Sequence, residues 1–204
     1  MKQILLMIAV GALGGGCGGK KAEPTKVVPE KLIANLIVEE ATRRILVKYT
    51  GKLTKADLKK VLVLHNKQLT DIPKDLEKLT PLTRLHLAGN KLSDVTGLEK
   101  LTQLYYLSLG GNKLTDLKGL EKLTQLGMLG LDNNQLTDVK GLEKLTQLKE
   151  LDLGGNQLTD VTGLEKLTKL TYLFLLNNPA LTKAQIDQLQ KALPKCVIRS
   201  NPTN

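Results

Sequence analysis

An asparagine recurs every 22 residues through the middle of this chain, and this period constrains the fold more than any other feature of the sequence. Each copy ends the pattern L-x-x-L-x-L-x-x-N. The five copies are Asn90, Asn112, Asn134, Asn156 and Asn178. An internal period of about 20–50 residues is typical of a solenoid, in which each unit buries its apolar side against its neighbours. We therefore expect one continuous core, built mostly from leucine.

Within one unit the leucines change their spacing, and this change predicts two kinds of backbone. Leu107 and Leu109 alternate with Tyr106 and Ser108, which is the period-2 pattern of a strand. The next leucines recur at every third residue, which favours a 3₁₀-like or irregular segment. These leucines are Leu114, Leu117, Leu120, Leu123 and Leu126. Both sets can point into one interior.

The pattern is that of a leucine-rich repeat. The 22-residue variant, in which T-D-V-x-G-L-E-K-L-T follows the Asn, resembles the class found in internalins and in a regulatory subunit of protein phosphatase 1. The resemblance covers roughly residues 58–180. It implies an α/β fold, namely a right-handed leucine-rich-repeat solenoid with short parallel strands on a concave face and a 3₁₀ or irregular convex side. Helical N- and C-terminal caps are expected to cover its apolar ends.

Three columns of equivalent residues have structural interpretations. A buried Asn carboxamide can bond backbone groups of its own turn and of the next unit, so the five Asn residues are expected to form a structural ladder. The Asp column is expected to cap the turn that follows, and the Gly column to relieve a tight bend. These columns are Asp94, Asp116, Asp138 and Asp160, and Gly97, Gly119, Gly141 and Gly163. A calcium ladder is the alternative for the acids, although no D-x-D spacing occurs among them.

The segments that flank the repeats predict the two caps. Residues 32–60 are expected to form the N-terminal helical cap, because Ile37, Ala41 and Ile45 recur at helical spacing. This segment resembles the N-terminal cap of internalin-like proteins. The repeats themselves are assigned to residues 61–181.

Residues 182–204 are expected to form a C-terminal helical cap and tail. Thr182 and Gln185 match a capping box at the start of a helix. One face of that helix carries Ile186, Leu189 and Leu193. After the helix, the run Cys196-Val197-Ile198 can add a last short strand, and Cys196 is expected to be a buried structural thiol.

The first residues indicate an export signal followed by a tether. Lys2 precedes an apolar run over residues 4–13, which is too short to span a bilayer but matches a secretory signal. Glycines then precede Cys17, and this arrangement resembles a bacterial lipoprotein signal, with Gly14 where that family usually has Leu. The resemblance implies a signal peptide over residues 1–16, lipidation of Cys17, and a flexible tether over residues 17–31.

The export signal has two alternatives, an ordinary cleaved signal and an uncleaved cytoplasmic protein. In a Gram-negative cell the residue after the lipidated Cys biases sorting. Gly18 is not the Asp that retains lipoproteins in the inner membrane, so the resemblance implies the outer membrane.

The net charge is +10, but the positive excess lies outside the repeats. Residues 20–60 carry eleven basic and five acidic side chains, whereas residues 61–178 carry fourteen of each. A protein that binds nucleic acid usually gathers its positive charge on one working face, so no nucleic-acid partner is expected. The basic N-terminal stretch instead suits an anionic membrane surface.

Variation between units falls on the residues that are expected to project from the concave face. The convex G-L-E-K-L-T segment repeats almost unchanged, so specificity is expected to reside in the rows that differ. Three of the five aromatic residues lie in these rows, and exposed aromatic side chains are good interface anchors. The candidate partner-binding residues are Arg84, His86, Tyr106, Ser108, Met128, Asp132, Glu150, Asp152, Tyr172, Phe174 and Leu176. Their three acids against one arginine favour a basic or amphipathic ligand.

The same rows offer little for catalysis or metal binding. His86 and Ser108 occupy equivalent positions on adjacent strands, about 4.8 Å apart, as in a minimal base–nucleophile pair. No Asp is placed to orient His86, and no G-x-S-x-G motif occurs. A metal site that includes His65 lacks a third ligand. The acids of the face are interpreted as a solvated rim rather than a cation site, and we expect no catalytic residue, metal or cofactor.

The sequence therefore predicts a cell-envelope lipoprotein that binds a protein or peptide through its concave face, without enzymatic activity. The alternatives are a structural envelope spacer without a specific partner, and a cytoplasmic regulatory protein of the phosphatase type. The ligand and the oligomeric state are not predicted.

Overall fold

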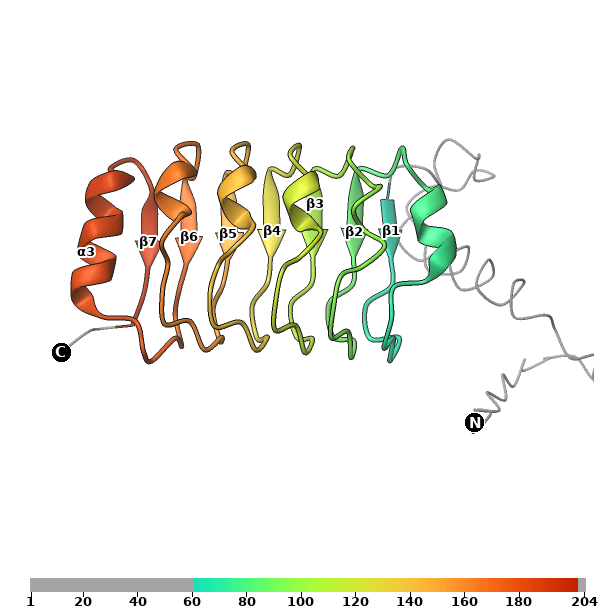
Figure 1. The fold of residues 1–204 in the computed structure, drawn as a ribbon, viewed down its shortest axis with the longest axis horizontal. Helices are drawn as coiled ribbons and strands as arrows, with labels where there is room; N and C mark the ends of the chain where they lie inside the picture. Colours follow the sequence, from blue (N-terminus) through green and yellow to red (C-terminus); the bar gives the residue numbers. More distant parts are fainter. Residues whose placement is uncertain (1–60, 202–204) are drawn as a thin grey trace, which may run out of the picture.

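The structure is a computed structural model and describes residues 61–201. Within these residues, parallel strands form one open sheet in which each strand pairs with its neighbours in the sequence. Figure 1 shows them side by side along the long axis of the molecule, with α3 beyond the last strand. The strands are β1 (Val61–Val63), β2 (Arg84–His86), β3 (Tyr106–Ser108), β4 (Met128–Gly130), β5 (Glu150–Asp152), β6 (Tyr172–Phe174) and β7 (Val197–Arg199). The predicted solenoid is confirmed.

The register of the sheet aligns equivalent residues of successive units. Leu107 of β3 pairs with Leu129 of β4, which pairs with Leu151 of β5. Val61 of β1 pairs with Arg84 of β2, because the first unit is one residue longer than the others. Equivalent residues therefore become rows that cross the strands.

Leucine fills the interior almost alone. In the unit that contains β3, every predicted core leucine is at most 2% exposed. These residues are Leu107, Leu109, Leu114, Leu117, Leu120, Leu123 and Leu126. In residues 61–201 no aromatic side chain belongs to this core. Burial of one leucine side chain contributes about 2 kcal/mol, so the free energy of folding grows with the number of stacked units.

The leucines spaced three apart form short 3₁₀ helices, as the sequence predicts. They are η1 (Lys74–Lys78), η2 (Leu120–Lys122), η3 (Leu142–Lys144) and η4 (Leu164–Lys166). Gly119 precedes η2 with a φ of +104°, a left-handed conformation that favours glycine. Its N–H donates to Glu121 Oε2 over 2.6 Å, so this acidic side chain closes the turn.

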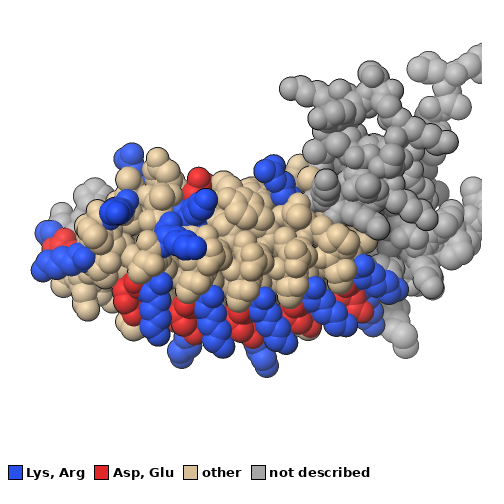
Figure 2. Space-filling view, turned by 90° about the horizontal axis from the view of Figure 1, so that it is seen from above, with Lys and Arg blue, Asp and Glu red and all other residues tan. Residues whose placement is uncertain are grey.

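Figure 2 shows acidic and basic side chains alternating along one edge of the array. The Glu and Lys residues of successive 3₁₀ helices occur there in the same order in each unit. Hydrogen bonds from the backbone N–H groups of Glu121 and Gly119 lower the pKa of Glu121. These glutamates therefore have a structural role in closing the turns.

The asparagine column is buried and hydrogen-bonded between units. Asn112 Nδ2 donates to Leu109 O over 2.8 Å in its own unit and to Leu87 O over 3.1 Å in the preceding one. Its Oδ1 accepts the N–H of Leu92 over 3.1 Å, also in the preceding unit. The equivalent bonds occur at Asn134, Asn156 and Asn178. The expectation that the carboxamide bonds the next unit is therefore wrong in direction. The turn places each Asn side chain against the backbone of the preceding unit.

The aspartate column closes the next turn locally. Asp116 Oδ1 accepts the N–H of Lys118 over 3.0 Å, and Asp138 Oδ1 accepts that of Lys140 over the same distance. Asp94 and Asp160 repeat the arrangement. The predicted capping role is confirmed, and these acids face their own backbone.

The C-terminal helix covers the last unit, and its predicted start is confirmed. Helix α3 (Lys183–Ala192) begins with a capping box, in which the Thr182 side chain accepts the N–H of Gln185 and the Gln185 side chain accepts the N–H of Thr182. Leu189 and Leu193 are buried. Cys196, just before β7, is also buried, and burial raises the pKa of its thiol.

The predictions for the N-terminal part lie outside the described residues. They are the signal peptide over 1–16, lipidation of Cys17 with a tether over 17–31, and the cap over 32–60. Among residues 61–201, no helix has both the length and the apolar character that crossing a membrane requires.

Replacing Asn134 with Ala should strongly destabilise the array. The change leaves Leu109 O, Leu131 O and Leu114 N without this partner, and a buried unsatisfied polar group costs about 1–3 kcal/mol. We expect urea denaturation to show a free energy of unfolding lower by about 2–4 kcal/mol.

Two further variants test the role of the carboxamide. Asn134→Asp keeps the shape but loses the donor, so it should also destabilise. Gln135→Ala, at the exposed neighbouring position, should change the free energy by less than about 0.5 kcal/mol. An Asn134→Ala protein as stable as the parent would contradict the role of the ladder.

Candidate functional site

The exposed side of the strands forms a grid of side chains, called here the strand face. In β1–β6 the central leucine of each strand is buried and its two neighbours are exposed or half-buried, as alternation along a strand requires. The first row contains Val61, Arg84, Tyr106, Met128, Glu150, Tyr172 and Val197. The second row contains Val63, His86, Ser108, Gly130, Asp152, Phe174 and Arg199. A third row follows the strands: His65, Ala88, Gly110, Asp132, Gly154 and Leu176.

The structure places every candidate binding residue in these rows, and none of them is buried. They fall into three groups along the array. The groups are Arg84, His86 and Tyr106 on β2 and β3; Asp132, Glu150 and Asp152 on or after β4 and β5; and Tyr172, Phe174 and Leu176 on or after β6. Ser108 and Met128 lie between the first two groups. The strand face therefore changes from cationic and aromatic, through acidic, to apolar.

The first group contains His86, the residue that would serve as a general base in the pair with Ser108. The ring centroid of His86 lies 4.7 Å from that of Tyr106, with the planes tilted by 37°. Burial, and then the neighbouring His65 and Arg84, lower the pKa of His86. No side-chain hydrogen bond in the described part joins His86 to Ser108, so the pair lacks the contact through which a base activates a nucleophile.

The second group holds two neighbouring carboxylates in different surroundings. Asp152 Oδ1 accepts the N–H of Gly154 over 2.9 Å. Burial raises the pKa of Asp152, the Gly154 bond opposes this, and the charge of Asp132 raises it further. Asp132 Oδ2 accepts from Asn133 Nδ2 over 2.8 Å, and its carboxylate lies above Gly110.

Most of the exposed large hydrophobic residues lie at the end of the array that contains the third group. Tyr172, Leu176 and Val197 are 47%, 41% and 45% exposed, and they are three of the four large hydrophobic residues exposed within residues 61–201. Val197 was not among the candidate residues, because the rows were assigned only up to β6. Strand β7 pairs with β6 and extends the rows by Val197 and Arg199. The run Cys196-Val197-Ile198 was the sequence signal for this strand.

The fourth exposed hydrophobic residue, Tyr105, was also not among the candidate partner-binding residues. It immediately precedes β3, is 40% exposed, and its ring lies over Gly127. Gly127 was the available sequence signal for this contact, because the equivalent positions of other units carry the larger Thr83 and Lys149. Tyr105 therefore adds an aromatic group at the rim of the strand face.

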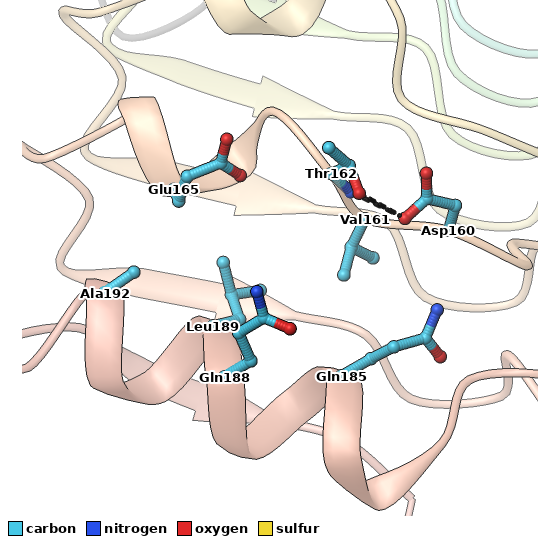
Figure 3. A pocket seen from close by; sticks show the side chains of 8 residues that line it. All are labelled: Asp160, Val161, Thr162, Glu165, Gln185, Gln188, Leu189 and Ala192. Atoms are coloured by element: carbon cyan, nitrogen blue, oxygen red, sulfur yellow. Dashed lines mark hydrogen bonds between the residues drawn. The ribbon is translucent and has the colours of Figure 1, made fainter.

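Three cavities of the described part are lined by residues outside the strand-face rows. One of about 220 Å³ separates η4 from α3, as Figure 3 shows. Its lining includes Asp160 and Thr162, whose side chains share a hydrogen bond of 2.7 Å, and Gln185 of the helix. Residues 61–201 contain no cluster of three or more His, Cys, Asp or Glu side chains that could hold a metal ion.

Replacing Asp152 with Asn should stabilise the protein near neutral pH. The pKa of this carboxyl is raised in the folded state, so its charged form costs stability above that pKa, and the cost disappears as the pH falls through it towards the ordinary value of 3.8. We expect a higher Tm than the parent at pH 7 and a gain that vanishes below about pH 4.

Asp187 of α3 is exposed and forms an ion pair with Lys183 over 2.9 Å, so it is a control for the loss of one negative charge that already has a basic partner. Asp187→Asn should give no comparable gain in Tm. A gain for Asp152→Asn that is equal at pH 7 and pH 3.5, or a loss at pH 7, would contradict the electrostatic explanation.

Comparison with solved structures finds bacterial proteins with this architecture. Internalin C2 of Listeria monocytogenes is 29% identical, with a TM-score of 0.56 over 80% of this chain and 84% of that one. The internalin InlF of the same species is 27% identical, with a TM-score of 0.57 over 81% of this chain and 57% of that one. The functional domain of InlJ from L. monocytogenes, which includes a cysteine ladder, is 26% identical, with a TM-score of 0.55 over 74% of this chain and 36% of that one. This chain thus spans less than two thirds of the last two structures.

Family models identify the repeats directly. The model described as "Leucine Rich repeats (2 copies)" matches residues 102–144 and 146–191, and the model described as "Leucine rich repeat" matches residues 58–114. A search of curated proteins finds no match. The matched segments cover more than half of the 204 residues and coincide with the stacked units of the structure. The chain belongs to the leucine-rich repeat family and is similar in structure to internalins.

Proposed function

We propose that this protein is a cell-envelope lipoprotein that binds a protein or peptide through its strand face and has no enzymatic activity or cofactor. The observation that carries the proposal is the contrast between the two sides of the array. On the convex side, acids close turns in the same way in each unit. On the strand face the residues differ from unit to unit, and the candidate residues there remain accessible.

The exposed groups on the strand face suit a polypeptide ligand. Solenoids use such extended faces for binding, and aromatic side chains dominate the energetics of many interfaces. Tyr172 and Val197 offer accessible apolar surface at one end. The acids Asp132, Glu150 and Asp152 outnumber Arg84 among the candidate residues, which favours a basic or amphipathic ligand over an anionic polymer such as a nucleic acid.

The N-terminal sequence supports the location. Lys2, the apolar run over residues 4–13 and Cys17 have the order of a lipoprotein signal, and the following 14 residues up to 31 have the composition of a tether. Lipidation of Cys17 would anchor the repeats at the membrane, the outer membrane in a Gram-negative cell. The structural similarity to internalins of a bacterium agrees with this origin.

Removing the aromatic pair of β6 should strongly reduce ligand capture. We expect the full-length Tyr172→Ala/Phe174→Ala protein to capture at least about tenfold less of its partner from an envelope extract, because aromatic anchors carry much of the binding energy. Quantitative mass spectrometry of the captured proteins measures the change.

The control for capture is Thr124→Ala/Gln125→Ala, at two exposed positions just before Leu126 and outside the strand-face rows. This protein should capture as much partner as the parent. Equal capture by the aromatic variant would reject the strand face as the binding site. It would favour the structural spacer, which the near-identical convex repeats also suit.

The anchor predicts a defined intact mass. Protein recovered from the membrane fraction of cells that express it naturally should begin at Cys17 and carry acyl groups. The Cys17→Ser protein should lose both the acyl mass and the membrane association. A mass that begins at Met1 without lipid would reject the envelope location and favour the cytoplasmic regulator, and a cleaved chain without lipid would indicate an ordinary signal.

A further inference from the structure

Three glycines interrupt the side-chain rows in the middle of the strand face. Gly110, Gly130 and Gly154 occupy successive units around β3, β4 and β5, and we call this region the glycine gap. A methyl group added at Gly130 would meet no atom closer than 3.8 Å, and the nearest would be Asp132 Oδ1. At Gly110 a methyl group would collide with the Asp132 carboxylate. The gap is therefore open at Gly130 and bordered by Asp132.

The acids around the glycine gap have no basic partner within residues 61–201. None of the ion pairs there involves Asp132, Glu150 or Asp152. The hydrogen bonds of Asp132 and Asp152 come from uncharged donors, the Asn133 side chain and the Gly154 N–H. Two neighbouring carboxylates without a counter-charge complement a cation supplied by a ligand.

An apolar surface lies a short distance further along the same rows. Gly130 of β4 and Phe174 of β6 share the second row, two strands apart. Adjacent strands are about 4.8 Å apart, so this separation is about 10 Å. A peptide in the polyproline II conformation advances about 3.1 Å per residue and has three residues per turn, so residues three apart lie on the same side and are about 9 Å apart. Beside Phe174 lie the exposed Tyr172 and, on β7, Val197.

The opposite end of the strand face excludes a basic group. Arg84 of β2 is exposed, and its charge adds to the effects of burial and of His65 that lower the pKa of His86. A ligand cation near β2 would meet like charge, whereas at β4 and β5 it meets the acids. Arg199 of β7 adds an exposed positive charge at the other end, beside Phe174. The acids at β4 and β5 lie between Arg84 and Arg199, and they define one position for a ligand cation along the array.

We propose that the ligand is a peptide segment in the polyproline II conformation, with a Lys or Arg side chain in the glycine gap and an apolar side chain three residues away on Tyr172, Phe174 and Val197. The inference rests on the proposed function, because it specifies the ligand of the same face. The carboxylates of Asp132 and Asp152 contact the cation, and the absent side chain at Gly130 gives it room.

A displayed library of random linear 12-residue peptides tests this motif against the purified full-length protein. We expect the enriched peptides to carry Lys or Arg three positions from Phe, Tyr, Trp, Leu, Ile or Val. The best peptide is then synthesised and its Kd measured, together with that of a copy in which Gln replaces the basic residue. The Gln copy should bind at least about tenfold more weakly.

Matched variants of the protein locate the contact. Asp132→Asn/Asp152→Asn should raise the Kd of the selected peptide at least about tenfold, and 0.5 M salt should weaken parent binding in the same direction. Gly130→Ala fits the backbone but fills the gap, so it should raise the Kd by about fivefold. Asp187→Asn removes one negative charge from α3, away from the strand face, and should leave the Kd unchanged. Thermal melts confirm that each variant is folded.

The outcomes separate this inference from the proposed function. Enriched peptides without the basic–apolar pair, no enrichment at all, or a Kd unchanged by Asp132→Asn/Asp152→Asn would overturn the inference. If such peptides still lose binding to the Tyr172→Ala/Phe174→Ala protein, the strand face remains the binding site and only the ligand motif is wrong. Binding that survives both double variants would reject the motif and the strand face together.

Discussion

The structure depends on one buried amide in each unit. The carboxamide of Asn112 joins two carbonyls and one N–H that the leucine core removes from water, and two of these groups belong to the preceding unit. A buried backbone group without a hydrogen-bond partner costs free energy. Each unit is therefore held at the one position relative to its neighbour from which the amide bonds both carbonyls and the N–H. Leucine burial supplies the free energy of folding, while the asparagine fixes the step between units.

This fixed step turns the outer side of the strands into a regular support for variable residues. The leucines and the asparagine satisfy the core, so the neighbouring positions on each strand are free to differ. The convex acids are constrained in another way, because Glu121 closes a 3₁₀ turn and Asp116 caps a loop. Acids on the strand face make fewer hydrogen bonds that close turns. We therefore propose that their charge can interact with a ligand.

The middle of the strand face is electrostatically unfavourable in the isolated protein. Asp152 is partly buried beside Asp132, and no basic side chain of the described part pairs with either carboxylate. Such an arrangement costs stability and gains an interaction only when a cation arrives. The stacked leucine units contribute enough favourable free energy to offset this loss of stability, because the contributions of the units and of their interfaces add. The residues that stabilise the array and the acids that we propose as ligand contacts therefore lie on different sides of it.

The sequence by itself determined the repeat, the strands, the 3₁₀ segments, the capping box at Thr182 and the rows of the strand face, because each depends on spacing within one unit. Contacts between units decided the rest. Only the tertiary structure showed that the asparagine bonds to the preceding unit, that Asp132 lies over Gly110, and that β7 extends the rows by Val197. These features depend on where a side chain turns and on what the neighbouring unit places beside it, and a one-dimensional period contains neither.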